Sequence, residues 1–191
     1  MRKSSPPSTG NGTRTVLGID PGTLVTGYGI VTRRGSTLRM VTCGTITNRS
    51  DVAMPLRLHR IYKELQALLK QHTPDEVAIE SAFYGKNVQS ALKLGHARGV
   101  SLLAAVEKNL PTAEYSPREV KLAVVGKGNA TKEQVRFMVS ALLQAPSPTM
   151  LLDASDALAV AICHCHRSTA PQKRHRDWKA FIAAHPERVH A

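Results

Sequence analysis

The sequence predicts an α/β domain built on a sheet whose strands run in both directions. Three strand-like segments come first along the chain, and helices then alternate with two shorter strands. A chain of 191 residues, 42% of them hydrophobic, is long enough to bury a core of its own. Aromatic residues make up only 4% of the chain, so we expect that core to be aliphatic.

The first half of the chain holds four of the five predicted strands. The first three are rich in Val, Ile, Thr and Tyr, which favour strands. The helix that follows, residues 54–72, places apolar side chains at intervals of three and four, and Pro74 ends it. The mostly apolar segment EVAIE at 76–80 is the fourth strand. The first three strands are expected at 15–20, 27–34 and 36–46.

A long helix over 87–110 opens the second half, and the fifth strand is expected at 112–115. Apolar residues cover more than one face of this helix. Such a helix is buried on two sides, either by the core or by a second subunit.

Helix start signals mark the last part of the chain. Ser116 is followed by a proline and then by Glu119, which together form a capping box with proline at the first helical position. Thr131 and Gln134 repeat the capping box at the next helix. The last helix is apolar and is expected at 151–166.

The two ends of the chain differ in composition from the body. Residues 1–13 are mostly Ser, Pro, Gly and Thr, and we expect a disordered leader. The domain is expected over 14–168 and a basic, flexible tail over 169–191. The leader lacks the apolar core of a secretion signal, and no apolar run reaches the ~18 residues that span a bilayer. We therefore expect a cytoplasmic protein.

Cysteine usage agrees with that expectation. The chain has three cysteines, an odd number, and we expect reduced thiols. Two of them stand in the run CHCH at 163–166. Alternating Cys and His on a helix point around its circumference, so they cannot all face one zinc ion.

The net charge of +12 is the strongest global signal. Residues 1–14 and 168–191 carry +3 each, and the body between them carries the remaining +6. Lys and Arg that neutralise phosphates release counterions, so a basic body favours a polyanionic partner. The alternative is a solvated surface that is basic without binding anything.

Four carboxylates stand at positions suited to a site. Asp20 ends the first strand and Glu80 ends the fourth, and ligands of open α/β sheets bind beyond strand ends. Asp153 and Asp156 are three apart, hence on one face of the last helix. Each also has an ordinary explanation, as a turn former, a polar strand end, or a helix N-cap with an acidic residue after it.

Together, four acids flanking buried elements would repel one another unless a cation neutralises them. Ligation by carboxylate oxygens alone suits Mg²⁺ or Mn²⁺ rather than Zn²⁺. Two such ions about 4 Å apart can activate a water molecule and stabilise the leaving oxygen in phosphodiester cleavage. A basic body around an acidic centre suits that substrate.

Four segments carry a resemblance to a known family. They are GIDPGTLVTGYGI, AIESAFYGKNVQSALKLGHARGV, YSPREVKLAVVGKGNATKEQV and DASDALAVAICHCH, and they span about residues 15–167. This set closely resembles the RuvC family of Holliday-junction resolvases, which are dimeric nucleases of the RNase H-like fold. The resemblance implies that fold, with a mixed five-stranded sheet flanked by helices, and it does not extend to the leader or the tail.

The resemblance also implies roles for particular residues. Asp20, Glu80, Asp153 and Asp156 match the catalytic, metal-binding acids, although some members have His at the position of Asp153. Phe83 matches an aromatic residue that inserts at the junction, where unstacked bases would pack on its ring. The basic residues Lys121 and Lys132 match positions near the scissile phosphate. Partnership with the RuvA–RuvB branch-migration machinery is implied as well.

Residue-level reasoning supports further DNA contacts but leaves alternatives open. Phe83 lies in the loop SAFYGKN, where it has no obvious place in a core, and ordinary packing is its alternative. Lys86 and Asn87 of that loop are further DNA-binding candidates. Lys127 belongs to a basic loop, 126–129, just before a helix N-terminus, which suits a phosphate contact. The alternative is a mobile surface loop, and the spacing does not match a Walker A motif.

Two other classes of protein share part of this pattern. The stretch VLGIDPGTLVTGYGI also resembles the first phosphate loop of actin-like kinases and chaperone ATPases, which share the RNase H-like core. Those proteins need two such lobes and a second glycine-rich phosphate loop, which we do not find in this sequence. The other class is a DNA-binding module without chemistry. The four acids argue against it, because a pure binder gains nothing from carboxylates facing phosphates.

The sequence therefore predicts a Mg²⁺- or Mn²⁺-dependent endonuclease with two ions in each active site. It would act as a homodimer that resolves four-way DNA junctions by paired symmetric nicks, in homologous recombination and DNA repair. Metal-activated water would attack the phosphorus and leave a 5′-phosphate and a 3′-hydroxyl.

Overall fold

The computed structural model describes residues 12–81, 88–145 and 151–167, and the chain there forms a five-stranded mixed sheet flanked by helices. The strand order is β3-β2-β1-β4-β5. Strands β1, β2 and β3 pair antiparallel, whereas β4 and β5 run parallel to β1. The predicted fold class is confirmed. The strands are β1 (Arg14–Asp20), β2 (Val25–Arg34), β3 (Thr37–Thr47), β4 (Glu76–Glu80) and β5 (Thr112–Tyr115).

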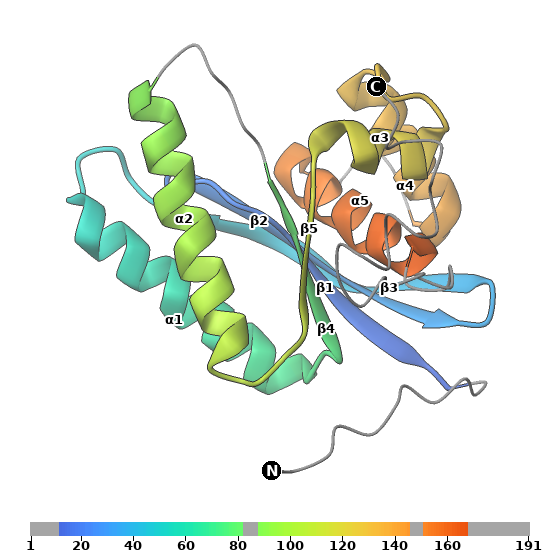
Figure 1. Cartoon of the computed structure of the whole chain (residues 1–191), viewed down its shortest axis with the longest axis horizontal. Coiled ribbons are helices and arrows are strands. Elements are labelled where there is room, and N and C mark those ends of the chain that lie inside the picture. Colours follow the sequence, from blue (N-terminus) through green and yellow to red (C-terminus); the bar gives the residue numbers. More distant parts are fainter. Residues whose placement is uncertain (1–11, 82–87, 146–150, 168–191) are drawn as a thin grey trace, which may run out of the picture.

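Helices cover both faces of the sheet (Figure 1). The first face carries α1 and α2, and the second carries α3, α4 and α5. Successive strand side chains point to opposite faces, so Leu17 and Ile19 of β1 pack with α1 and α2, while Val16 packs with α5. The helices are α1 (Met54–His72), α2 (Val88–Val106), α3 (Pro117–Val125), α4 (Lys132–Leu143) and α5 (Leu152–Arg167).

Helix α5 lies directly on the strands because two glycines leave room for it. A Cβ atom on Gly18 of β1 would stand 2.1 Å from the backbone oxygen of Ala157. A Cβ on Gly27 of β2 would stand 2.0 Å from the backbone oxygen of Asp153. Any larger residue at either position would push the helix off the sheet.

The helix starts follow the sequence closely. Both predicted capping boxes are formed: Ser116 with Glu119 starts α3, and Thr131 with Gln134 starts α4. The expected end of α2 is wrong by four residues. The helix stops at Val106, and the chain turns through Asn109, which has a left-handed φ of 55°.

Helix α2 buries only one of its two apolar faces against the rest of the chain. Ala97, Ala104 and Ala105 pack into the core, whereas Leu103 and Val106 are exposed. None of the helices within the described ranges is long and apolar enough to cross a membrane. The predicted tail, 169–191, lies wholly outside the described residues, and so does the predicted leader apart from residues 12 and 13.

Candidate active site

Asp20 and Glu80 meet at one end of the sheet, as their strand positions predicted. Each is the last residue of its strand, and β1 and β4 are parallel neighbours in which Ile19 pairs with Ile79. The alternation of side chains along a strand places both carboxylates on the face that carries α5. Two acids separated by 60 positions in sequence therefore stand side by side.

The first turn of α5 brings the other two acids to this end. Gly27 pairs with Asp20 across β1 and β2, and the backbone oxygen of Asp153 lies directly over Gly27. Asp156 follows one turn later and is mostly buried. The close packing of α5 on Gly27 therefore brings Asp153 and Asp156 beside the strand ends.

Electrostatics show that these side chains share one site. Burial raises the pKa of Asp20 from an ordinary 3.8 to about 8, and the charges of Glu80, Asp156 and Asp153 add to the rise. Burial likewise raises the pKa of Glu80 from 4.5 to about 7, with Asp156 as the next cause. Two carboxyl groups are therefore held where their own charge is disfavoured, a pattern typical of functional sites.

Two lysines of the α3–α4 layer oppose that negative charge. Lys132, the first residue of α4, places its Nζ 2.9 Å from Oδ2 of Asp156, and this hydrogen bond raises the pKa of Lys132. The charge of Lys132 also lowers the pKa values of Asp20 and Glu80, and Lys121 of α3 lowers that of Glu80. Both predicted basic residues thus lie close enough to act on the acids.

The donor set fits a divalent cation that binds oxygen. Carboxylates that burial and mutual repulsion destabilise gain most from a nearby cation, and Asp and Glu oxygens suit Mg²⁺ or Mn²⁺. Within the described ranges, however, no three His, Cys, Asp or Glu side chains are grouped tightly enough to hold an ion as they stand. A bound cation would offset the mutual repulsion of these carboxylates.

The remaining predicted residues divide into two groups. Phe83, Lys86 and Asn87 lie outside the described residues, so their predicted DNA contacts stay predictions. Lys127 lines a groove of about 430 Å³ on the α3–α4 surface, together with Phe137, and its predicted DNA contact stays a prediction.

One part of the site was missed by the sequence reasoning. A pocket of about 130 Å³ opens beside Asp20 and Glu80, and side chains of α2 form its other wall. Arg98 is the basic residue of that wall, and it also forms an ion pair with Glu114 of β5. The signal was present in the segment SALKLGHARG, which we used for the family resemblance and interpreted as a helix buried on two sides, without assigning Arg98 a role. The pocket residues from α2 are Ala91, Leu94, Gly95 and Arg98.

Comparison with known proteins gives a consistent answer. The family described as crossover junction endodeoxyribonuclease RuvC matches residues 16–164. A protein of that name from Pelobacter propionicus is 50% identical over 173 residues, which cover 87% of this chain and 98% of the relative. Another, from Cytophaga hutchinsonii, is 42% identical over 176 residues, with 92% of this chain and 88% of the relative covered.

Solved structures agree at the level of the fold. The structure of T. thermophilus RuvC in complex with a Holliday junction substrate has a TM-score of 0.77 and 32% identity to this chain. The alignment covers 81% of this chain and 94% of that one. The yeast mitochondrial Holliday junction resolvase Ydc2 shares the fold at a TM-score of 0.57 and 13% identity, covering 79% of this chain and 78% of its own.

Proposed function

Because the chain belongs to the RuvC family of crossover junction endodeoxyribonucleases, we propose that it resolves four-way (Holliday) DNA junctions in homologous recombination and DNA repair. The observation that carries the proposal is the meeting of Asp20 and Glu80 at neighbouring strand ends, with the acids of α5 beside them. The complex of the T. thermophilus relative with a Holliday junction supports the choice of substrate.

The proposal includes a dependence on Mg²⁺ or Mn²⁺. Asp20, Glu80, Asp153 and Asp156 would hold the ions, two in each site. When bound, such ions lower the pKa of a water molecule and stabilise the leaving oxygen. In-line attack of water at phosphorus would leave a 5′-phosphate and a 3′-hydroxyl.

The side chains around the acids would bind and orient the DNA. The ammonium groups of Lys132 and Lys121 give the otherwise acidic site a positive border where a phosphate can bind. Arg98 gives the adjacent pocket a positively charged wall. Phe83, Lys86, Asn87 and Lys127 are further proposed contacts, with Phe83 stacking on bases that the junction leaves unpaired.

A homodimer is part of the proposal, and the exposed face of α2 supports it. Leu103 is 52% exposed, and Val88, Leu92 and Val106 of the same helix are more exposed still. A row of large apolar side chains along one helix is typical of a surface that another protein covers. A two-fold dimer would place two identical sites on a junction that itself has approximate two-fold symmetry, and this accounts for paired nicks. Partnership with RuvA–RuvB rests on the family resemblance alone.

A cleavage assay tests the function. The purified protein is incubated with a synthetic four-way junction and with a linear duplex of matching sequence, each with and without Mg²⁺. We expect symmetric nicks in two strands of the junction, only with the metal, and an intact duplex. Equal cleavage of both substrates, or cleavage in excess chelator, would contradict the proposal.

A further inference from the structure

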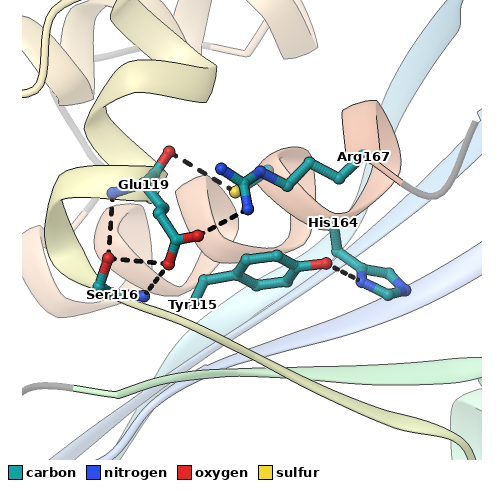
Figure 2. Close-up of polar contacts among 6 residues, drawn as sticks. Tyr115, Ser116, Glu119, His164 and Arg167 are labelled. Carbon is teal, nitrogen blue, oxygen red and sulfur yellow. Dashed lines mark hydrogen bonds and ion pairs between the residues drawn. The ribbon is translucent and has the colours of Figure 1, made fainter. Parts of the chain in front are cut away.

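The C-terminal half of α5 carries a buried polar network far from the acids. His164 is only 8% exposed, and its Nδ1 lies 2.7 Å from the hydroxyl of Tyr115 at the end of β5 (Figure 2). Its Nε2 contacts the carboxylate of Glu76 at the start of β4. One imidazole thus joins α5 to two strands at once.

With a neutral imidazole, the hydrogen bonds of this network have one consistent set of donors and acceptors. A carboxylate only accepts hydrogen bonds, so Nε2–H of His164 donates to Glu76. In the neutral imidazole Nδ1 is then an acceptor, and the hydroxyl of Tyr115 donates to it. Every ring nitrogen has a partner, which is the condition under which a buried polar group stabilises one arrangement over others.

Other polar contacts fasten the same end of the helix. Arg167 lies 2.7 Å from Glu119, the capping residue of α3, and its guanidinium stands over the ring of Tyr115 (Figure 2). Arg33 of β2 donates to the backbone oxygen of Cys165. The end of α5 opposite the acids is therefore tied to three strands and to a neighbouring helix.

The network and the acids lie at opposite ends of one helix–strand pair. Asp156 faces Glu80, the last residue of β4, and His164 contacts Glu76, the first. The eight residues from Asp156 to His164 rise about 12 Å along a helix. The four residues from Glu76 to Glu80 rise about 13 Å along a strand. The two spacings match, so a contact at one end sets the register at the other.

Between these ends α5 has no directional contact with β4. Residues 157–162 are Ala, Leu, Ala, Val, Ala and Ile, and all are buried. Apolar packing of this kind fills space without favouring one register strongly. The polar network therefore adds a directional contact on β4 to the close packing of α5 on Gly18 and Gly27 of the neighbouring strands.

We propose that His164 is a positioning residue for the nuclease site. With Glu76 and Tyr115 it fixes the register of α5 on β4, so that Asp153 and Asp156 stand opposite Asp20 and Glu80. The inference rests on the proposed metal-binding role of those acids, and it assigns His164 no contact with substrate or metal.

Metal binding tests the proposal more directly than activity does. Binding of Mn²⁺ to the DNA-free protein is measured by calorimetry for the wild type, H164A and H164Q. Loss of a group that orients ligands typically weakens metal binding by about 10–100-fold, and we expect H164A to fall in that range. Gln retains an N–H that can reach Glu76, so H164Q should recover most of the affinity. Junction binding in chelator should be unchanged in both variants.

Two further variants separate the possible outcomes. His166 lies on the same helix, is exposed and contacts the backbone of α3, so H166A is the matched control and should bind Mn²⁺ like the wild type. D20N tests the metal site itself: if it binds Mn²⁺ as well as the wild type does, the proposed function fails and this inference falls with it.

If D20N loses Mn²⁺ but H164A keeps wild-type affinity and only melts earlier, His164 merely stabilises the fold and the inference is overturned. Should H164A not fold, Y115F carries the test, because it removes one hydroxyl and keeps the ring. Weaker Mn²⁺ binding is expected there too, and unchanged affinity would count against the inference.

Discussion

Among the residues that the structure describes, Asp20 is the one whose charge the fold disfavours most. Burial and three acidic neighbours raise its pKa to about 8, while Lys132 opposes the rise only in part. Glu80 follows the same pattern more weakly, with a pKa of about 7. A protein selected for stability alone would not retain such groups, and their presence in a shared site favours a functional role.

The raised pKa of Asp20 predicts that the metal-free protein loses stability as the pH rises. Between the unfolded pKa near 3.8 and the folded pKa near 8, the folded state keeps a proton that the unfolded state has lost. Stability supplied by this group is therefore complete below about pH 4 and is lost progressively up to about pH 8. D20N removes the titration. In chelator, D20N should melt above the wild type at pH 8, and the difference should shrink toward pH 4.

Thermal melts of both proteins across that pH range check the prediction. One unit of the pKa shift corresponds to about 1.4 kcal/mol. In a protein of this size that is roughly 3–5 °C in melting temperature. Adding Mg²⁺ should narrow the difference at pH 8. A D20N protein that melts below the wild type at every pH would contradict the assignment of Asp20 to a repulsive site.

At the scale of elements, the close packing of α5 on the sheet decides whether the acids meet. The backbone oxygen of Asp153 lies where a Cβ on Gly27 would be, at 2.0 Å, and backbone cannot move aside as a flexible side chain can. G27A should therefore displace the first turn of α5. We expect a loss of about 1–3 kcal/mol in unfolding free energy and a much weaker response to Mg²⁺.

Gly99 of α2 is the matched control, since a Cβ there meets no atom within 4 Å. G99A should keep or raise stability, by about 0.5–1 kcal/mol, because Ala favours a helix over Gly. Chemical denaturation of both variants makes the comparison. Equal changes in unfolding free energy for the two substitutions would show that the close approach at Gly27 does not contribute to stability.

Local signals in the sequence were enough to predict most elements. The capping boxes at Ser116 and Thr131 start α3 and α4 as expected, because each is formed by residues three apart. The carboxyl ends of parallel strands meet at one edge, which made the pairing of Asp20 with Glu80 predictable. The end of α2 was not predictable in the same way, since Glu107 and Lys108 are good helix formers and the first residue after Val106 that breaks a helix is Pro111.

Contacts between segments far apart in the chain could not be predicted from the sequence. His164 was considered only within the run CHCH, and nothing local indicates that its partners are Tyr115, 49 positions away, and Glu76, 88 positions away. Arg98 is a similar case. It lies on a helix that the apolar pattern explained as buried, and only the fold shows that it faces the pocket beside the acids.

At the scale of the whole molecule, the exposed face of α2 predicts a dimer. L103E places a charge on that face and should convert the protein to a monomer in sedimentation at micromolar concentration. Leu122 on α3 is a matched control, because it is 53% exposed, close to the 52% of Leu103, but lies in the opposite layer of the fold. L122E should sediment like the wild type. A wild-type protein that is monomeric and still nicks both strands would contradict the dimer.

The proposed function depends on the four acids acting through a metal on junction DNA. The most direct measurement compares the wild type with D20N, E80Q and D156N, each of which keeps the side-chain shape and removes one charge. Junction binding in chelator and junction cleavage in Mg²⁺ are measured on the same preparations. We predict that all three variants bind the junction and that cleavage falls by orders of magnitude. Normal cleavage by all three variants would contradict the central claim.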